Sequence, residues 1–142
     1  MNSPPDIPQF THPHDICSKW IGVSAIFLAL AVCLGAFGAH GLRERLDAYS
    51  MSVYEKAVFY HFIHALGLLC VSIISSLHLC SSAGASRVSW ALALGIVIFS
   101  GSLYALAITG VRWLGAITPI GGLAFIIAWL MLAADVLWQS RS

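Results

Sequence analysis

Charge is scarce in this sequence. Only 9% of its 142 residues are Asp, Glu, Lys or Arg, and 59% are hydrophobic, whereas a soluble domain usually carries about 25% charged residues. This shortage excludes a soluble globular domain and indicates an integral membrane protein whose partner is the lipid bilayer. The net charge is only +1 and no block of Lys and Arg is present, so the sequence indicates no nucleic-acid partner.

Cysteine motifs are missing as well. The cysteines are Cys17, Cys33, Cys70 and Cys80, and none of them forms a CxxC pair or has zinc-ligand spacing. Cys33 and Cys70 lie inside apolar stretches, so we predict that they are small buried core residues. Cys17 and Cys80 could meet on one side of the membrane, where the redox compartment would decide whether they form a disulfide.

Four long apolar stretches are present instead. They cover residues 20–42, 53–79, 88–109 and 113–138, and each is close to the roughly 20 residues that cross the hydrocarbon core of a bilayer. The sequence therefore predicts an all-α fold, a bundle of four transmembrane helices that fills a membrane domain at residues 19–142. A cleaved signal peptide is the alternative for the first stretch.

The first 18 residues differ in character from the rest. They contain several prolines among scattered polar residues, a composition that resists both helix and sheet. We predict a flexible N-terminal arm over residues 1–18. His12 and His14 flank Pro13 there, and we interpret them as solvated side chains rather than as metal ligands.

A short charged segment separates the first two stretches. It carries an apolar face of helical spacing, which predicts a short amphipathic helix in the membrane interface. Ser52 and Glu55 match a capping box, which places the start of the second spanning helix near Val53. The residues of the apolar face are Leu42, Leu46, Tyr49 and Val53.

Small residues indicate where helices approach closely. Several recur at four-residue spacing in the first stretch, a pattern that favours helix packing either within the chain or against a second copy. In the fourth stretch Pro119 precedes two glycines, so the helix either begins late or is broken, and a broken helix could line a binding site. The predicted packing residues are Ala31, Gly35, Gly38, Ala39, Gly121 and Gly122.

Polar residues concentrate at one predicted membrane face, because an even number of spans returns alternate helix ends to the same side. His61 and His64 share a helical face and could bind a metal or haem or relay protons. Alternatively, they bond to neighbouring groups and lock helices together. Arg112 could bind an anion or cap the third helix. The candidate cluster is His40, Tyr60, His61, His64, Tyr104, Thr109, Arg112 and Thr118.

One acidic residue lies near the end of the last stretch. We expect Asp135 to pair with Arg87 or Arg141, or to extend outward to the interface, because a lone charge inside the hydrocarbon region is costly. A buried ion-coupling role is the alternative.

Several local motifs resemble a known family. They are GAFGAHGL at residues 35–42, Tyr60-His61 followed by His64-Ala65-Leu66, GSLY at 101–104 and TGVRWLGAITPIGG at 109–122. The sequence is similar over about residues 20–138 to domain-of-unknown-function family 423, the YgdD-like proteins that also resemble transmembrane protein 256. The resemblance implies a four-helix protein of a bacterial inner membrane and supplies no activity.

The expected function is therefore non-enzymatic, because no nucleophile, base and orienting partner occur at recognisable spacing. We expect a scaffold or accessory subunit that forms a homo-oligomer or joins a larger membrane complex, with no cofactor. A small-solute or proton pathway and a haem or metal protein using the membrane histidines are the alternatives.

Overall fold

The computed structural model describes residues 13–140, with side chains from Ser18 onward. The first helix is α1 (Pro13–Phe37), extended by the wide turn η1 (Gly38–Leu42), and the second is α2 (Ala48–Ser76). The third is α3 (Ser82–Gly95), the π-helical η2 (Ile96–Ser100) and α4 (Gly101–Thr109) in one continuous rod. The fourth joins the 3₁₀ turn η3 (Arg112–Ala116) to α5 (Thr118–Gln139).

Within the described residues, four helical stretches are long and apolar enough to cross a membrane, at 18–42, 48–76, 82–109 and 112–139. The predicted all-α bundle of four transmembrane helices is confirmed. Residues 1–12, and the side chains of His14 and Cys17, lie outside the described part of the chain. Since α1 already begins at Pro13, the helix starts earlier than predicted and includes residues 13–18 of the predicted arm. For residues 1–12 the arm stays a prediction.

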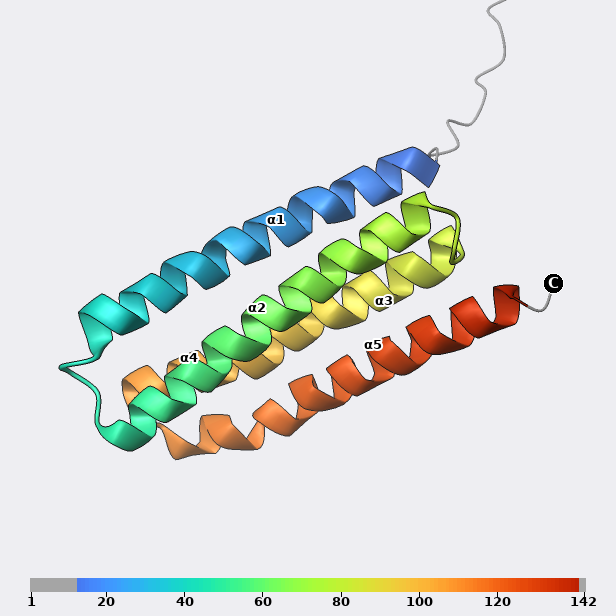
Figure 1. Ribbon diagram of the computed structural model, residues 1–142. Coiled ribbons are helices and arrows are strands. Elements are labelled where there is room, and N and C mark those ends of the chain that lie inside the picture. Colours follow the sequence, from blue (N-terminus) through green and yellow to red (C-terminus); the bar gives the residue numbers. More distant parts are fainter. Residues whose placement is uncertain (1–12, 141–142) are drawn as a thin grey trace, which may run out of the picture.

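Two helices form the centre of the bundle and two flank it. Figure 1 shows α1 and α5 on opposite sides of the central pair formed by α2 and the α3–α4 rod. In the most apolar stretches of α2 and of the rod, 44% of the residues are buried within the chain. In those of α1 and α5 the share is 17%. The main core lies between the two central helices and α5, and it includes Leu68, Val71, Val88, Leu92 and Ala128.

A side-chain cap sets the start of the second helix. Asp47 accepts a hydrogen bond from the N–H of Ser50 at 2.6 Å, so α2 begins at Ala48. This bond, together with one from the Ser50 hydroxyl, holds the pKa of the Asp47 carboxyl below its usual value. The interfacial helix predicted between the first two spans is therefore not a separate element. Its second half, including the predicted capping box at Ser52, forms the first turns of α2.

The third helix also begins at a side-chain cap, whereas the fourth begins with a proline. Ser81 accepts from the N–H of Gly84 at 2.9 Å, and α3 consequently begins at Ser82, before the predicted start of the third helix. Pro119 occupies the first turn of α5, where its missing N–H costs no helical hydrogen bond. Of the two predicted alternatives, the fourth helix therefore begins late and is not broken.

Small residues bring helices together inside this chain. Ala31 is 1% exposed, and a Cβ atom at Gly38 would lie 2.5 Å from the Tyr54 ring. A Cβ at Gly121 would contact the Phe99 backbone. Of the other predicted packing residues, Gly35 and Gly122 are partly covered and Ala39 is exposed.

The prediction for two cysteines is wrong. Cys33 and Cys70 are exposed on the surface of the bundle rather than buried in its core. Their apolar sequence context reflects the apolar surroundings of a spanning helix, and it does not distinguish a side chain that faces lipid from one that faces protein.

Candidate functional site at the charged end of the bundle

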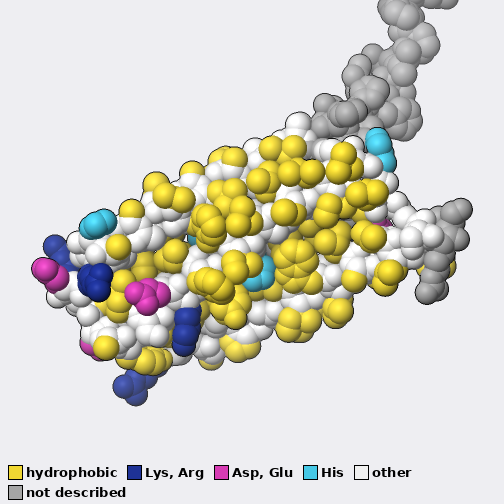
Figure 2. All heavy atoms as spheres, viewed as in Figure 1, with side chains coloured by type: hydrophobic (Ala, Val, Ile, Leu, Met, Phe, Trp, Pro, Cys, Tyr) yellow, Lys and Arg dark blue, Asp and Glu magenta, His cyan; other side chains and the backbone are white. Residues whose placement is uncertain are grey.

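Charged side chains gather at one end of the molecule. Figure 2 shows them at the end where α1 turns into α2, while the flank of the bundle is largely apolar. Arg43, Glu55 and Lys56 are exposed there, as is Arg112 on the neighbouring connection between α4 and α5. The polar residues singled out from the sequence lie at this end or in the layer just beneath it.

Tyr54 is the buried polar residue nearest the charged end. Its side chain is 1% exposed, and its hydroxyl donates a hydrogen bond to the Leu34 carbonyl at 2.8 Å, which ties α2 to α1. The ring of Tyr104 lies beside it, with centroids 5.1 Å apart. No role for Tyr54 was predicted from the sequence. The signal that could have identified it is the glycine at position 38, which leaves room for the ring.

His61 lies one layer deeper and faces α1 and α4. It is 4% exposed, its Nδ1 is 3.4 Å from the Tyr104 hydroxyl, and its ring meets that of Phe27 edge-on at 5.7 Å. Its Nε2 atom has no hydrogen-bond partner among the described residues, although the Phe27 backbone is a neighbour of the imidazole. His61 thus joins three helices and leaves one polar atom unsatisfied.

His64 faces the opposite outer helix. Its Nδ1 donates to the Tyr60 carbonyl at 2.8 Å, since a carbonyl oxygen can only accept. Its ring stacks on Phe125 of α5 with centroids 3.5 Å apart, and the Trp129 ring lies 6.3 Å away. The two histidines therefore contact different helices. In the described part of the chain, no three His, Cys, Asp or Glu side chains are grouped in a way that could hold a metal ion.

The rest of the predicted cluster is dispersed. Thr118 and Ser102 share a hydrogen bond of 2.8 Å, and Thr109 bonds within its own helix to the Ala105 carbonyl at 2.6 Å. Tyr60 packs against Phe99, and His40 is exposed. The eight residues share one end of the bundle, but they do not line one site.

Arg112 does not cap the third helix. Gly110 ends α4 in the left-handed conformation, with φ of 70°, and its N–H donates to the Leu106 carbonyl as in an αL cap. Arg112 is exposed and borders a hollow of about 220 Å³ together with Asp47. The alternative that Arg112 binds an anion stays a prediction.

Asp135, at the other end of the bundle, has a partner that the sequence did not indicate. It accepts hydrogen bonds from the N–H and the hydroxyl of Ser81 at 2.7 and 2.8 Å. The expected pair with Arg87 does not form, because the Arg87 Nε donates to the Ala83 carbonyl at 3.3 Å, and Arg141 lies outside the described residues. Asp135 thus fastens α5 to the start of α3.

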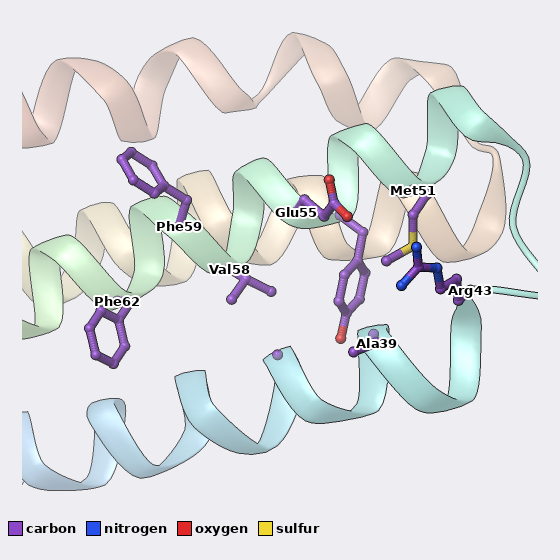
Figure 3. A pocket seen from close by; sticks show the side chains of 10 residues that line it. Ala39, Arg43, Met51, Glu55, Val58, Phe59 and Phe62 are labelled. Atoms are coloured by element: carbon purple, nitrogen blue, oxygen red, sulfur yellow. The ribbon is translucent and has the colours of Figure 1, made fainter.

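A cleft opens between α1 and α2 at the charged end (Figure 3). Its volume is about 380 Å³, within the range of small-molecule pockets. Arg43 lies at one end of it and Phe62 at the other, with Val58 between them. The lining residues are Gly35, Gly38, Ala39, Arg43, Met51, Tyr54, Glu55, Val58, Phe59 and Phe62.

Comparisons with known proteins identify the family. A family model described as "Protein of unknown function (DUF423)" matches residues 34–122. The chain belongs to this family. The chain is 52% identical to a UPF0382 membrane protein of Staphylococcus saprophyticus, over 80% of this chain and 92% of the relative. It is 46% identical to UPF0382 membrane protein YwdK of Bacillus subtilis, over 80% of this chain and 91% of that protein.

No solved structure matches the chain. The relatives are named as membrane proteins, and together with the four spanning helices they identify this DUF423 chain as a multi-pass membrane protein. The family model covers α2, the rod and the whole of the α1–α2 cleft, so the cleft lies within the segment that defines the family.

Proposed function

We propose that this DUF423 protein is a non-enzymatic scaffold or accessory subunit of a membrane assembly. The observation that carries the proposal is the use of the buried polar groups. Tyr54 and His64 bond to backbone carbonyls, and Ser102 bonds to Thr118. The bonds of Tyr54 and Ser102 join different helices of the chain, and that of His64 lies within α2. These three groups thus have a structural rather than a catalytic use.

The outer helices support the same proposal. In the most apolar stretches of α1 and α5 only 17% of the residues are buried within the chain, so many of their side chains are available to lipid or to another membrane protein. Helix association in a bilayer depends on such side-chain packing, because lipid tails are as apolar as the helices.

Cross-linking in intact membranes, followed by native mass spectrometry from mild detergent, tests this function. A defined oligomer or a stoichiometric complex with another membrane protein supports a scaffold. Free monomers in both measurements would refute it. The exposed Cys33 and Cys70 provide cross-linking positions on α1 and α2 that leave the core intact.

A proton pathway is the second candidate, and His61 favours it. The imidazole lies beneath the charged end beside Tyr104, and its Nε2 has no hydrogen-bond partner in the described structure. A buried imidazole with a free nitrogen can exchange a proton. Proton flux into proteoliposomes that is lost in His61→Leu, but not in the exposed control His40→Leu, would support this function. Equal flux with and without protein would refute it.

A further inference from the structure

We propose that the α1–α2 cleft binds one phospholipid molecule with a zwitterionic headgroup. Its headgroup would lie at Arg43 and Glu55, whose charges match its phosphate and its ammonium group, and one acyl chain would lie along Val58 and Phe62. This ligand site is independent of the proposed scaffold function, because it requires no second protein.

The depth of the cleft matches one leaflet. Along α2 the lining runs from Met51 to Phe62, which at 1.5 Å per residue is about 16 Å. The hydrocarbon core of a bilayer is about 30 Å thick. The cleft therefore extends from the charged end of the bundle to about the middle of the membrane, which is the span of one acyl chain.

The lining changes character along this direction. Arg43 and Glu55 lie toward the charged end, whereas Val58, Phe59 and Phe62 line the deeper part (Figure 3). A molecule that fits must be charged at one end and apolar over the rest of its length. A phospholipid has this pattern, whereas a spanning helix is apolar along most of its length.

The two charged residues match a headgroup that carries both signs. Arg43 and Glu55 are both exposed and border the same cleft, yet in the described structure neither forms an ion pair. A guanidinium binds phosphate through paired N–H donors. The Glu55 carboxylate on the same cleft favours a cation, and it disfavours a headgroup that carries only negative charge. This charge complementarity selects an ammonium-bearing phospholipid over an anionic one.

Small residues form most of the α1 wall of the cleft. Ala39 is exposed beside the cleft, whereas Gly35 lies against α2, because an added Cβ would be 3.4 Å from Val58. The space of about 380 Å³ is bordered on this side by residues with little or no side chain, apart from Arg43. A larger residue at position 39 would fill it without entering the protein core.

Native mass spectrometry of the full chain in mild detergent, titrated with dioleoyl phosphatidylethanolamine, tests the site. Ala39→Leu should lower the fraction of lipid-bound protein severalfold, because the leucine side chain occupies the cleft. Ala36→Leu is the matched control, since Ala36 is exposed on the same helix and does not line the cleft. Unchanged binding in Ala39→Leu, with helix content and thermal stability retained, would overturn the proposal.

The headgroup contacts have their own controls. Arg43→Gln should weaken binding about tenfold, the effect of losing a charge-assisted hydrogen bond, while Arg45→Gln, whose residue lies outside the cleft, should not. Glu55→Gln should shift preference from phosphatidylethanolamine toward phosphatidylglycerol. Equal weakening by Arg43→Gln and Arg45→Gln would mean general attraction to the charged end and would overturn the site. If the protein is not a scaffold, the mass spectrum will show protein monomers, whether or not they carry a bound lipid.

Discussion

Gly121 should be the least replaceable glycine in α5. It is buried where α5 crosses η2. A Cβ atom there would contact the backbone nitrogen of Phe99 and lie 2.7 Å from its Cβ and 2.8 Å from its Cα. Because these are backbone and near-backbone atoms, they cannot move without displacing η2. At Gly122 the added atom would lie 3.6 Å from the Phe99 ring, which is an ordinary contact distance.

Comparing Gly121→Ala with Gly122→Ala isolates the effect of the close contact with Phe99. Overpacking a close contact costs about 1–3 kcal/mol, and Gly→Ala in a helix gains about 0.5–1 kcal/mol. The second term applies to both positions, so it cancels in the comparison. Gly121→Ala should therefore unfold about 1–3 kcal/mol more readily than Gly122→Ala, which should be neutral or slightly stabilised.

Reversible unfolding in mixed micelles, followed by circular dichroism as sodium dodecyl sulfate is added, measures this difference. Wild type, Gly121→Ala and Gly122→Ala would be compared at one lipid-to-detergent ratio. Equal free energies of unfolding for the two variants would refute the close approach of α5 to η2 and the crossing that depends on it.

The remaining predictions concern hydrogen bonds at helix ends and interfaces. Tyr54→Phe should lower the free energy of unfolding by about 0.5–1.5 kcal/mol. Tyr49 is 70% exposed, so the control Tyr49→Phe should leave this free energy unchanged. Equal effects of the two variants would contradict the bond from Tyr54 to α1. Asp135→Ala should lower the melting temperature more than Asp135→Asn, because asparagine keeps an acceptor for the Ser81 N–H at the start of α3. An equal loss of melting temperature in the two variants would contradict the bond between Ser81 and Asp135. Because hydrogen bonds from Ser50 lower the pKa of Asp47, its capping contribution is complete above about pH 4 and is lost as pH falls through the lower folded-state pKa. Amide protection at the start of α2 should fall only in that acid range, and Asp47→Ala should remove the pH dependence.

Hydropathy alone predicts the number of helices and the end of the bundle where charge gathers. It does not predict where helices start, because the caps at Asp47 and Ser81 act through single hydrogen bonds that leave average hydropathy unchanged. The bond between Asp135 and Ser81 joins residues far apart in sequence. Only the packing of α5 on α3 brings them together.

The histidines show a limit of spacing arguments. His61 and His64 share a helical face, yet a separation of three residues still turns one side chain about 60° from the other around the axis. In a bundle with neighbours on both sides of α2, that angle sends His61 to α1 and α4 and His64 to α5. The α1–α2 cleft was not predictable either, because it requires the facing surfaces of both helices.

The flanking position of α1 and α5 has a mechanical consequence. Each terminus belongs to an outer helix that is joined mainly to one central helix (Figure 1). A pulling force applied to the outer ends of α1 and α5 would therefore separate each of them from its central helix first. The contact between α2 and the rod would bear the force only afterwards. Such stepwise opening follows the least buried elements first. The contact between α2 and the rod would then be the last to open, because neither of these helices lies on the outside of the bundle.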